Sequence, residues 1–264
     1  MRLPFFFPMR RKTVKAKKQE RDPEIPLVEH LAELRTRLVR SVIMIVLAST
    51  AIWFFYDPLY TFFTAPIRPY LPKEGGLIVT NWLEPFFIQL KLSLYCGLVA
   101  SAPFWILEMW AFIAPGLTPQ ERKPIRLLAP LTILLFLMGV VLAHLVLPMT
   151  FGWALGYMPP EARLLQKITD YVEFLAKMYL AFGIAFQLPV VLMFLASVGI
   201  VDSTLMKRFW RQAVIIIMLI AAIITPSNDP VTMMICATPM ALLYMLSIFL
   251  VGRMEQQEAD EDKT

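Results

Sequence analysis

Long apolar segments alternate with short polar ones along most of the chain, a pattern typical of proteins that cross a membrane several times. Six apolar runs predict transmembrane helices at Leu38–Tyr56, Phe86–Phe112, Leu127–Pro148, Val172–Val201, Gln212–Thr225 and Val231–Val251. A helix needs about 20 apolar residues to cross about 30 Å of hydrocarbon. The fifth run reaches only about 21 Å at about 1.5 Å per residue. We therefore predict an all-α integral membrane protein with six spans, in which spans five and six form a short hairpin.

The segment before the first span, Pro26–Leu38, has the pattern of an amphipathic helix that continues directly into that span. Its apolar stripe has helical spacing and consists of Leu27, Leu31, Leu34 and Leu38. Residues 1–26 are a basic tail, and residues 252–264 are an acidic one. We expect residues 27–251 to form the membrane domain between two cytoplasmic tails. Prolines inside spans predict kinks, here at Pro103, Pro189 and Pro239.

The distribution of Lys and Arg predicts the orientation, because basic residues accumulate in cytoplasmic loops. The basic tail and the start of the first helix would lie inside, together with the loops after spans two and four. With both termini in the cytoplasm, the outer loops contain only Arg68, Lys73, Arg163 and Lys167 of the 25 basic residues, apart from two lysines near span ends. The opposite orientation would place most of the basic residues outside.

Composition supports the membrane assignment and narrows the chemistry. The chain is 58% hydrophobic and only 17% charged, with a mean hydropathy of +0.63. The net charge of +5 comes largely from the N-terminal tail, which indicates contact with anionic lipid rather than nucleic acid. Cys96 and Cys236 both lie within apolar runs, where we expect buried thiols. The motifs of hydrolases, metalloproteases and nucleotide-binding loops are missing, so we predict no catalytic residues, metal or cofactor.

The stretch Trp110–Arg126 contains a dense charged cluster between two apolar runs. Within it, Thr118 and Glu121 have the spacing of a helix capping box. Glu121 therefore either closes that box or presents a carboxylate at the membrane surface. Glu33 also has two interpretations, because it could pair with Arg37 one helical turn later or accept an external cation. We predict that carboxylates held out at the membrane surface by the stretch Trp110–Arg126 bind a basic peptide.

Three further polar positions have a structural interpretation. Gln187 lies in the middle of span four beside Pro189, where it could bond to backbone carbonyls that the proline leaves free or serve a function. Asp170 and Glu173 are spaced like a capping box at the start of span four. Asn228-Asp229-Pro230 is expected to cap span six.

Six motifs, in order along the chain, together resemble the TatC family, the polytopic subunit of the twin-arginine protein translocase. They are HLAELRTRL (30–38), APIRPYLP (65–72), EPFFIQLKLSL (84–94), SAPFWILEMWAFIAPGLTPQERK (101–123), AFGIAFQLPVV (181–191) and ITPSNDPVT (224–232). The resemblance covers about Leu27 to Val251. It implies a cupped, glove-like bundle in the cytoplasmic (inner) membrane of a prokaryote.

The resemblance also implies a function: a receptor for signal peptides with consecutive arginines, which starts proton-gradient-driven export of folded proteins. Glu33 in HLAELR and Glu121 in PQERK would receive the arginine pair. Other positions that the family depends on are matched by Arg35, Phe112, Arg122 and Pro66. Asp229, within ITPSNDPVT, is a further candidate functional residue. Gln187 matches a polar position on the concave face that is often Glu. A guanidinium is always charged and its planar fork matches a carboxylate, which fits acidic acceptors.

The implied partners are single-span subunits of the TatA and TatB type, other copies of the chain, and lipid. Thr225 is expected to offer hydrogen bonds to a partner helix at the end of the short span five. The main alternative is a secondary transporter for a small solute, which predicts inverted repeats and charges at the membrane midplane. An intramembrane protease would need a nucleophile and base, and the sequence provides no plausible pair.

Overall fold

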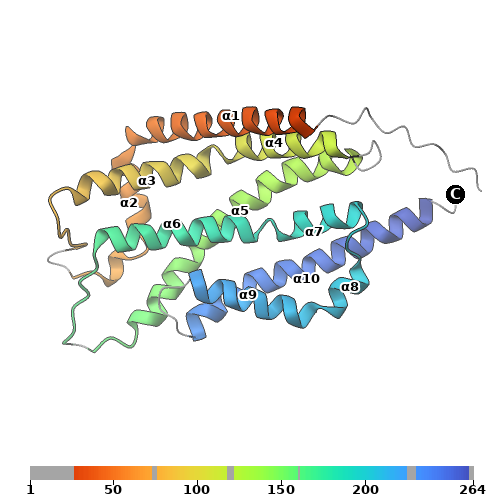
Figure 1. Cartoon of the computed structure of the whole chain (residues 1–264). Helices are drawn as coiled ribbons and strands as arrows, with labels where there is room; N and C mark the ends of the chain where they lie inside the picture. Colours follow the sequence, from red (N-terminus) through yellow and green to blue (C-terminus); the bar gives the residue numbers. More distant parts are fainter. Residues whose placement is uncertain (1–26, 73–75, 118–121, 160, 225–229, 262–264) are drawn as a thin grey trace, which may run out of the picture.

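The computed structural model describes the backbone of residues 27–72, 76–117, 122–159, 161–224 and 230–261. It also describes the side chains of these residues, apart from those of 27–28, 122–127, 224 and 257–261. Within these ranges the chain is helical (Figure 1). The helices are α1 (Leu27–Trp53), α2 (Tyr56–Thr64), α3 (Glu84–Ala100), α4 (Ala102–Ile113), α5 (Arg122–Leu155), α6 (Ile168–Ala185), α7 (Leu188–Ser197), α8 (Ser203–Arg208), α9 (Trp210–Ile224) and α10 (Pro230–Glu261), with short 3-10 turns at Arg68–Tyr70 and Ala114–Gly116.

Within the described part of the chain, four helical segments are long and apolar enough to cross a membrane: Glu29–Trp53, Leu128–Leu155, Ile168–Ser197 and Pro230–Gln256. A fifth is formed by α3 and α4 if the bent pair counts as one span. The remaining apolar helix, Trp210–Ile223, is shorter, as expected for the fifth predicted span. The expectation that span six is also short was wrong, because Pro230–Gln256 is a continuous apolar segment of 27 residues. The all-α membrane fold is thus confirmed, whereas the count of six spans and the orientation of the termini stay predictions.

The kink expected at Pro103 is present as a complete break. The axes of α3 and α4 differ by 52°, and the break falls at Ser101. Proline lacks an N–H and its ring obstructs the preceding turn, so a continuous helix is unfavourable here. The indole Nε1 of Trp105 donates a 3.1 Å hydrogen bond to the Leu98 carbonyl, which satisfies a backbone acceptor at the break. A second interruption separates α6 from α7, just before Pro189.

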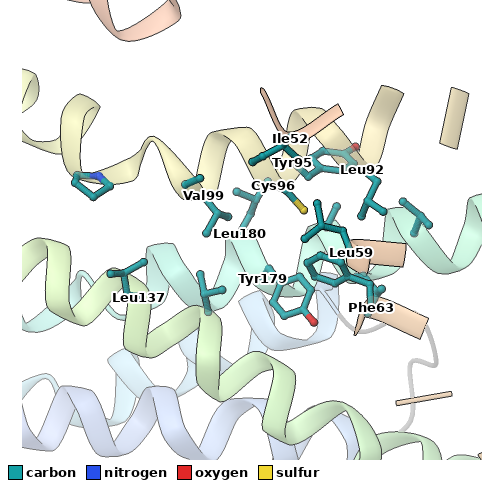
Figure 2. A pocket seen from close by; sticks show the side chains of 16 residues that line it. Ile52, Leu59, Phe63, Leu92, Tyr95, Cys96, Val99, Leu137, Tyr179 and Leu180 are labelled. Carbon is teal, nitrogen blue, oxygen red and sulfur yellow. The ribbon is translucent and has the colours of Figure 1, made fainter. Parts of the chain in front are cut away.

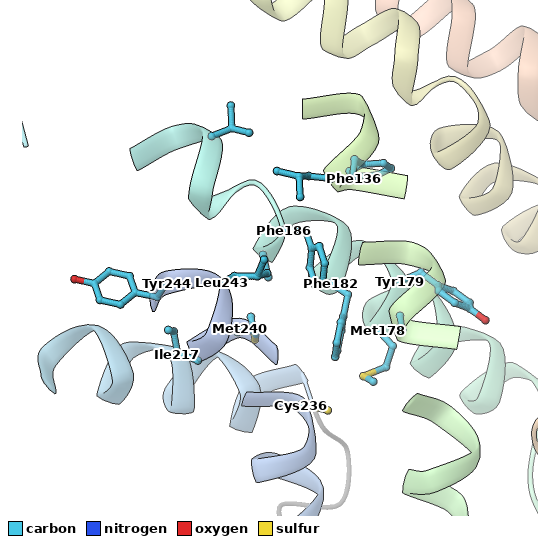
Figure 3. Packing of buried hydrophobic residues seen from close by; sticks show 14 of the residues in the cluster. Phe136, Met178, Tyr179, Phe182, Phe186, Ile217, Cys236, Met240, Leu243 and Tyr244 are labelled. Carbon is cyan, nitrogen blue, oxygen red and sulfur yellow. The ribbon is translucent and has the colours of Figure 1, made fainter. Parts of the chain in front are cut away.

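Buried aromatic and sulfur-containing side chains fill the space between α5, α6, α9 and α10. Phe182 and Phe186 point from the end of α6 toward Met240 of α10, with Ile217 of α9 nearby (Figure 3). Phe136 of α5 belongs to the same core and is 1% exposed. Since helices in lipid associate mainly through van der Waals packing, this close fit is the main stabilising interaction of the bundle.

Small residues allow two pairs of helices to approach closely. At the crossing of α5 and α6, a Cβ on Gly139 would lie 2.6 Å from the Phe182 carbonyl oxygen, and a Cβ on Gly183 would lie 2.7 Å from the Phe136 ring. At the crossing of α1 and α3, a Cβ on Gly97 would lie 2.6 Å from the Cα of Ser49. Such small residues at interfaces are typical of membrane helices.

One end of the bundle, on the left of Figure 1, is closed by α2 and the loops before α3 and α6. Here Glu84 is only 9% exposed and accepts hydrogen bonds from the Thr80 amide and from the hydroxyls of Thr80 and Thr169. Ile78 and Lys167 form an isolated backbone bridge between the two loops. These contacts tie α3 to α6 and hold this end of the bundle together.

The capping box expected at Asp170 and Glu173 was wrong. Helix α6 begins at Ile168, and its N-cap, Lys167, makes no side-chain capping bond. Glu173 instead forms an ion pair with Lys91 of α3. An ionised partner on a neighbouring helix binds a carboxylate more strongly than a backbone amide does, because both groups of the pair are charged.

The opposite end, on the right of Figure 1, brings together the start of α1, the end of α4, the start of α5, the loop from α7 to α8 and the end of α10. At this end Asp202 caps α8 by accepting from the Leu205 amide, and hydrogen bonds from Thr204 and Leu205 lower the pKa of its carboxyl. Glu255 of α10 accepts from both the amide and the hydroxyl of Ser203. These contacts attach the end of α10 to α8.

Candidate functional site

A cluster of charged side chains joins α1 to α4 at the end of the bundle where α1 begins. Arg37 stands at its centre. Its Nε and Nη2 donate to the same oxygen, Oε1 of Glu33, at 2.9 and 2.5 Å. Its Nη1 donates to Oε2 of Glu108 on α4 at 2.9 Å. One guanidinium therefore bridges two carboxylates that are far apart in the sequence.

The cluster is partly shielded from its surroundings. The side chains of Arg37, Glu108 and Glu33 are 21%, 25% and 28% exposed. Arg40 is more exposed, and its Nη1 lies 3.8 Å from Oε1 of Glu108, too far for a hydrogen bond. Arg37, Arg40 and Glu108 also line a hollow of about 530 Å³ between the two helices, which has Met44 and other apolar side chains on its walls.

An aromatic contact continues this cluster toward the start of α1. The His30 ring stacks on Phe112 of α4, with centroids 4.4 Å apart and planes 16° from parallel. The Nδ1 atom of His30 lies 3.8 Å from Oε2 of Glu33. His30 therefore lies between Phe112 and Glu33, two residues that were expected to bind the same peptide.

The structure thus brings together Glu33 and Phe112, two of the predicted site residues. Arg35 is on the same helix but is exposed. Glu121, Thr225 and Asp229 lie outside the described residues, as does the side chain of Arg122. Pro66 is buried beyond the end of α2, at the opposite end of the bundle from Glu33.

Gln187 lies inside the bundle, at the interruption between α6 and α7. Its Nε2 donates to the carbonyls of Gly183, at 3.2 Å, and Thr132, at 3.3 Å. Thr132 of α5 also accepts a 2.9 Å hydrogen bond from the indole of Trp110 on α4. Gln187 bonds to backbone carbonyls, but these are the carbonyls of Gly183 and Thr132 and not that of Ala185, which Pro189 leaves free. The two bonds link the break between α6 and α7 to α5. The Oε1 atom of Gln187 is buried and has no partner among the described residues.

An apolar cavity of about 370 Å³ lies between α1, α2, α3, α5 and α6 (Figure 2). Aliphatic and aromatic side chains line it, and its few polar groups include the Tyr95 and Tyr179 hydroxyls and the Cys96 thiol. The Tyr179 hydroxyl is 2.8 Å from Nδ1 of His144. Among its lining residues no side chain is ionised at neutral pH, so the cavity lacks the charged groups that a site for a small ionic solute requires.

Sequence reasoning identified the Glu33–Arg37 pair but missed the bond from Arg37 to Glu108. A glutamate inside a predicted span was the available signal, because an ionised side chain at that depth needs a partner. Which cation it meets depends on how α1 and α4 are rotated against each other, and neither helix determines this alone. The stack of His30 on Phe112 was missed for the same reason.

This arrangement holds a guanidinium, that of Arg37, between two carboxylates. A carboxylate pair at a membrane surface, with an aromatic face beside it, matches the charge and planarity of an arginine side chain. Among the described residues, no group of three or more His, Cys, Asp or Glu side chains could hold a metal ion. The carboxylates and the aromatic face of the site suit ionic binding of a planar cation.

Comparisons with known proteins identify a family for the chain. Residues 29–239 match the family model described as "Sec-independent protein translocase protein (TatC)". The chain is 36% identical to the TatC protein of Koribacter versatilis, over 92% of this chain and 94% of that protein. It is 33% identical to the TatC protein of Azotobacter chroococcum, over 90% of this chain and 93% of that one. A crystal structure titled as the twin-arginine translocase receptor TatC has a TM-score of 0.73 and 33% identity, covering 85% of this chain and 98% of its own.

Proposed function

Since the chain belongs to the TatC family, the receptor subunits of the Sec-independent, twin-arginine translocase, we propose that Glu33 and Glu121 together bind the arginine pair of a signal peptide. Two arginines need two acidic acceptors at the membrane surface, where the adjacent apolar part of the peptide can enter lipid. Glu33 supplies one acceptor, at the edge of the first span. The loop that contains Glu121 follows Gly116, close in sequence to the end of α4 beside which Glu33 lies.

The observation that supports this proposal most directly is the geometry around Glu33. The carboxylate already binds a guanidinium, that of Arg37, through two hydrogen bonds. Its environment is therefore one in which an arginine side chain fits. The stacked His30 and Phe112 rings lie beside it and can cover the apolar faces of an incoming planar group. Recognition here requires binding alone, with no covalent step.

The remaining elements of the proposal concern topology and partners. Both termini and the Glu121 loop face the cytoplasm of a prokaryotic inner membrane, as the distribution of basic residues predicts. The short α9 and its neighbour α10 form the docking surface for single-span TatA- or TatB-type subunits. The outer end of α9 stops well before the end reached by α3 and α6 (Figure 1). A short partner helix beside it would reduce the cost of the resulting mismatch with the bilayer. Several copies of the chain assemble in the active receptor.

The test is the affinity of full-length protein for a fluorescent twin-arginine peptide, measured by anisotropy in nanodiscs. Removing one partner of a charge-assisted hydrogen bond costs about 1.5–3 kcal/mol, or roughly ten- to a hundredfold in Kd. We expect this loss for both Glu33→Gln and Glu121→Gln. Glu29→Gln removes an equally negative but exposed side chain one turn earlier on α1 and is expected to change the affinity less than twofold.

A second variant separates recognition from helix capping at Glu121. Glutamine keeps much of the geometry of a capping box but has no charge. Wild-type affinity in Glu121→Gln, with loss only in Glu121→Ala, would show that the residue acts as a cap. The proposed binding role would then be wrong.

A further inference from the structure

We infer that Arg37 is an internal competitor for the peptide's arginine, and that Glu108 is the group that receives Arg37 when the peptide displaces it. This inference rests on the proposed function, because it concerns the same carboxylate of Glu33. It assigns roles to two residues of the chain that would control how tightly, and how selectively, the receptor binds.

The first argument is that Arg37 occupies the atom that a ligand needs. A peptide guanidinium binds a carboxylate most strongly through a fork that uses both oxygens. Arg37 directs two donors, Nε and Nη2, at Oε1 of Glu33. The other oxygen, Oε2, has the Nδ1 of His30 at 3.8 Å, beyond hydrogen-bond distance. An incoming arginine can therefore form its fork only if Arg37 releases Oε1.

The second argument is that Arg37 has somewhere to go. Its third donor, Nη1, is already bonded to Oε2 of Glu108 at 2.9 Å. A guanidinium at the edge of the hydrocarbon region cannot be left without a partner, since a lone charge there is costly. Rotation about the side chain's terminal bonds would move it from sharing two carboxylates to binding Glu108 alone, next to a hollow of about 530 Å³.

The exchange also provides discrimination. Arg37 binds only Oε1 of Glu33, whereas a peptide arginine can bind both oxygens through its planar fork, so the carboxylate loses no hydrogen bond in the exchange. A lysine offers a compact ammonium without the planar fork, and it would have to displace two hydrogen bonds from Arg37 while forming fewer of its own. An internal arginine therefore raises the threshold for ligands that only carry positive charge.

The experiment measures Kd for twin-arginine and twin-lysine peptides with the full-length chain in nanodiscs. For Arg37→Gln we expect twin-arginine binding to tighten about two- to fivefold, the scale of a partly exposed ion pair, and twin-lysine binding to tighten at least as much. For Glu108→Gln we expect twin-arginine binding to weaken by a similar factor, because Arg37 then has no second carboxylate. In the double variant, tight binding should return.

Arg40→Gln is the matched control for charge, since it removes the same charge one turn further along α1; Arg40 lies 3.8 Å from Glu108, but the structure gives it no ion pair with Glu33. If it tightened binding as much as Arg37→Gln, the effect would be general electrostatics and the inference would be wrong. It would also be wrong if Arg37→Gln weakened binding, because Arg37 would then hold Glu33 in place. The inference would also be overturned if Glu108→Gln weakened twin-arginine binding as much in the Arg37→Gln variant as it does in the wild type.

Two further variants keep the outcome interpretable. Arg37→Lys keeps a cation at the site but lacks the fork, so we expect an intermediate gain in affinity; this variant decides the question if Arg37→Gln does not yield folded protein. Glu33→Gln separates the two proposals. Unchanged binding in Glu33→Gln would refute the proposed function itself, whereas a loss there combined with no gain in either Arg37 variant would refute only the competition.

Discussion

The contact between α1 and α3 makes a quantitative prediction for Gly97→Ala. An added Cβ would lie 2.6 Å from both the Cα and the backbone nitrogen of Ser49. Carbon atoms in good contact are about 3.5–4.0 Å apart, so α1 would have to move by roughly 1 Å. A change of side-chain rotamer cannot relieve this overlap, because the atoms concerned belong to the backbone.

The expected loss follows from two opposing effects. Overpacking of a close interface costs about 1–3 kcal/mol, and backbone contacts place this site at the upper end of that range. Alanine regains about 0.8–1 kcal/mol over glycine in a helix interior. We therefore expect the free energy of unfolding to fall by about 2 kcal/mol. Helix α1 has few other contacts that could offset this loss, because the apolar part of its span is not buried in the described bundle.

The assay is reversible unfolding in mixed micelles, followed by tryptophan fluorescence. Gly116→Ala is the matched control, since a Cβ there would meet no atom within 4 Å; we expect it to change stability by less than about 0.5 kcal/mol. If Gly97→Ala were as stable as the wild type, or more stable, the close approach of α1 and α3 would not be as described and the reasoning would fail.

Two further predictions concern other helices. Gly139→Ala should lose about 1–2 kcal/mol of unfolding free energy in the same assay, because its Cβ would meet the Phe182 carbonyl. Gly152→Ala should be tolerated, since the atom nearest to its Cβ is a hydroxyl at the far end of a tyrosine side chain. Equal stability of the two variants would contradict this prediction. In the proposed docking surface on α9, a cysteine at Ile223, which is 84% exposed, should crosslink to a single-span partner, while one at the buried Ala221 should not. Crosslinking at both or at neither position would argue against that surface.

The apolar runs and prolines were enough to predict most of the fold. They identified the long spans, the short α9 and the break near Pro103, because hydrocarbon thickness and proline geometry act on each segment separately. They also identified the pair formed by Glu33 and Arg37, which lies within one helix. Local rules of this kind succeed when all partners are near in sequence.

The rest of the site depends on contacts between helices that are far apart in the chain. Glu108 is 71 residues from Arg37, and only the packing of α4 against α1 makes them partners. For Glu173 the local pattern predicted the wrong partner. Its spacing from Asp170 matched a capping box, but Lys91 of α3 binds it instead. The rotation of each helix about its axis decides such pairings, and the sequence of one segment does not contain it.

The length of α9 has a consequence for how the chain is made. At about 1.5 Å per residue, Trp210–Ile224 spans roughly 22 Å, less than the roughly 30 Å of hydrocarbon that an independently inserted helix must cross. During synthesis such a segment is poorly retained in the bilayer until α10 emerges behind it. We expect the two helices to enter the membrane as one unit, with the packing of Ile217 against α10 completed before either is released into lipid. Assembly of the last fifth of the protein would then follow the pairing of these two helices rather than their order of synthesis.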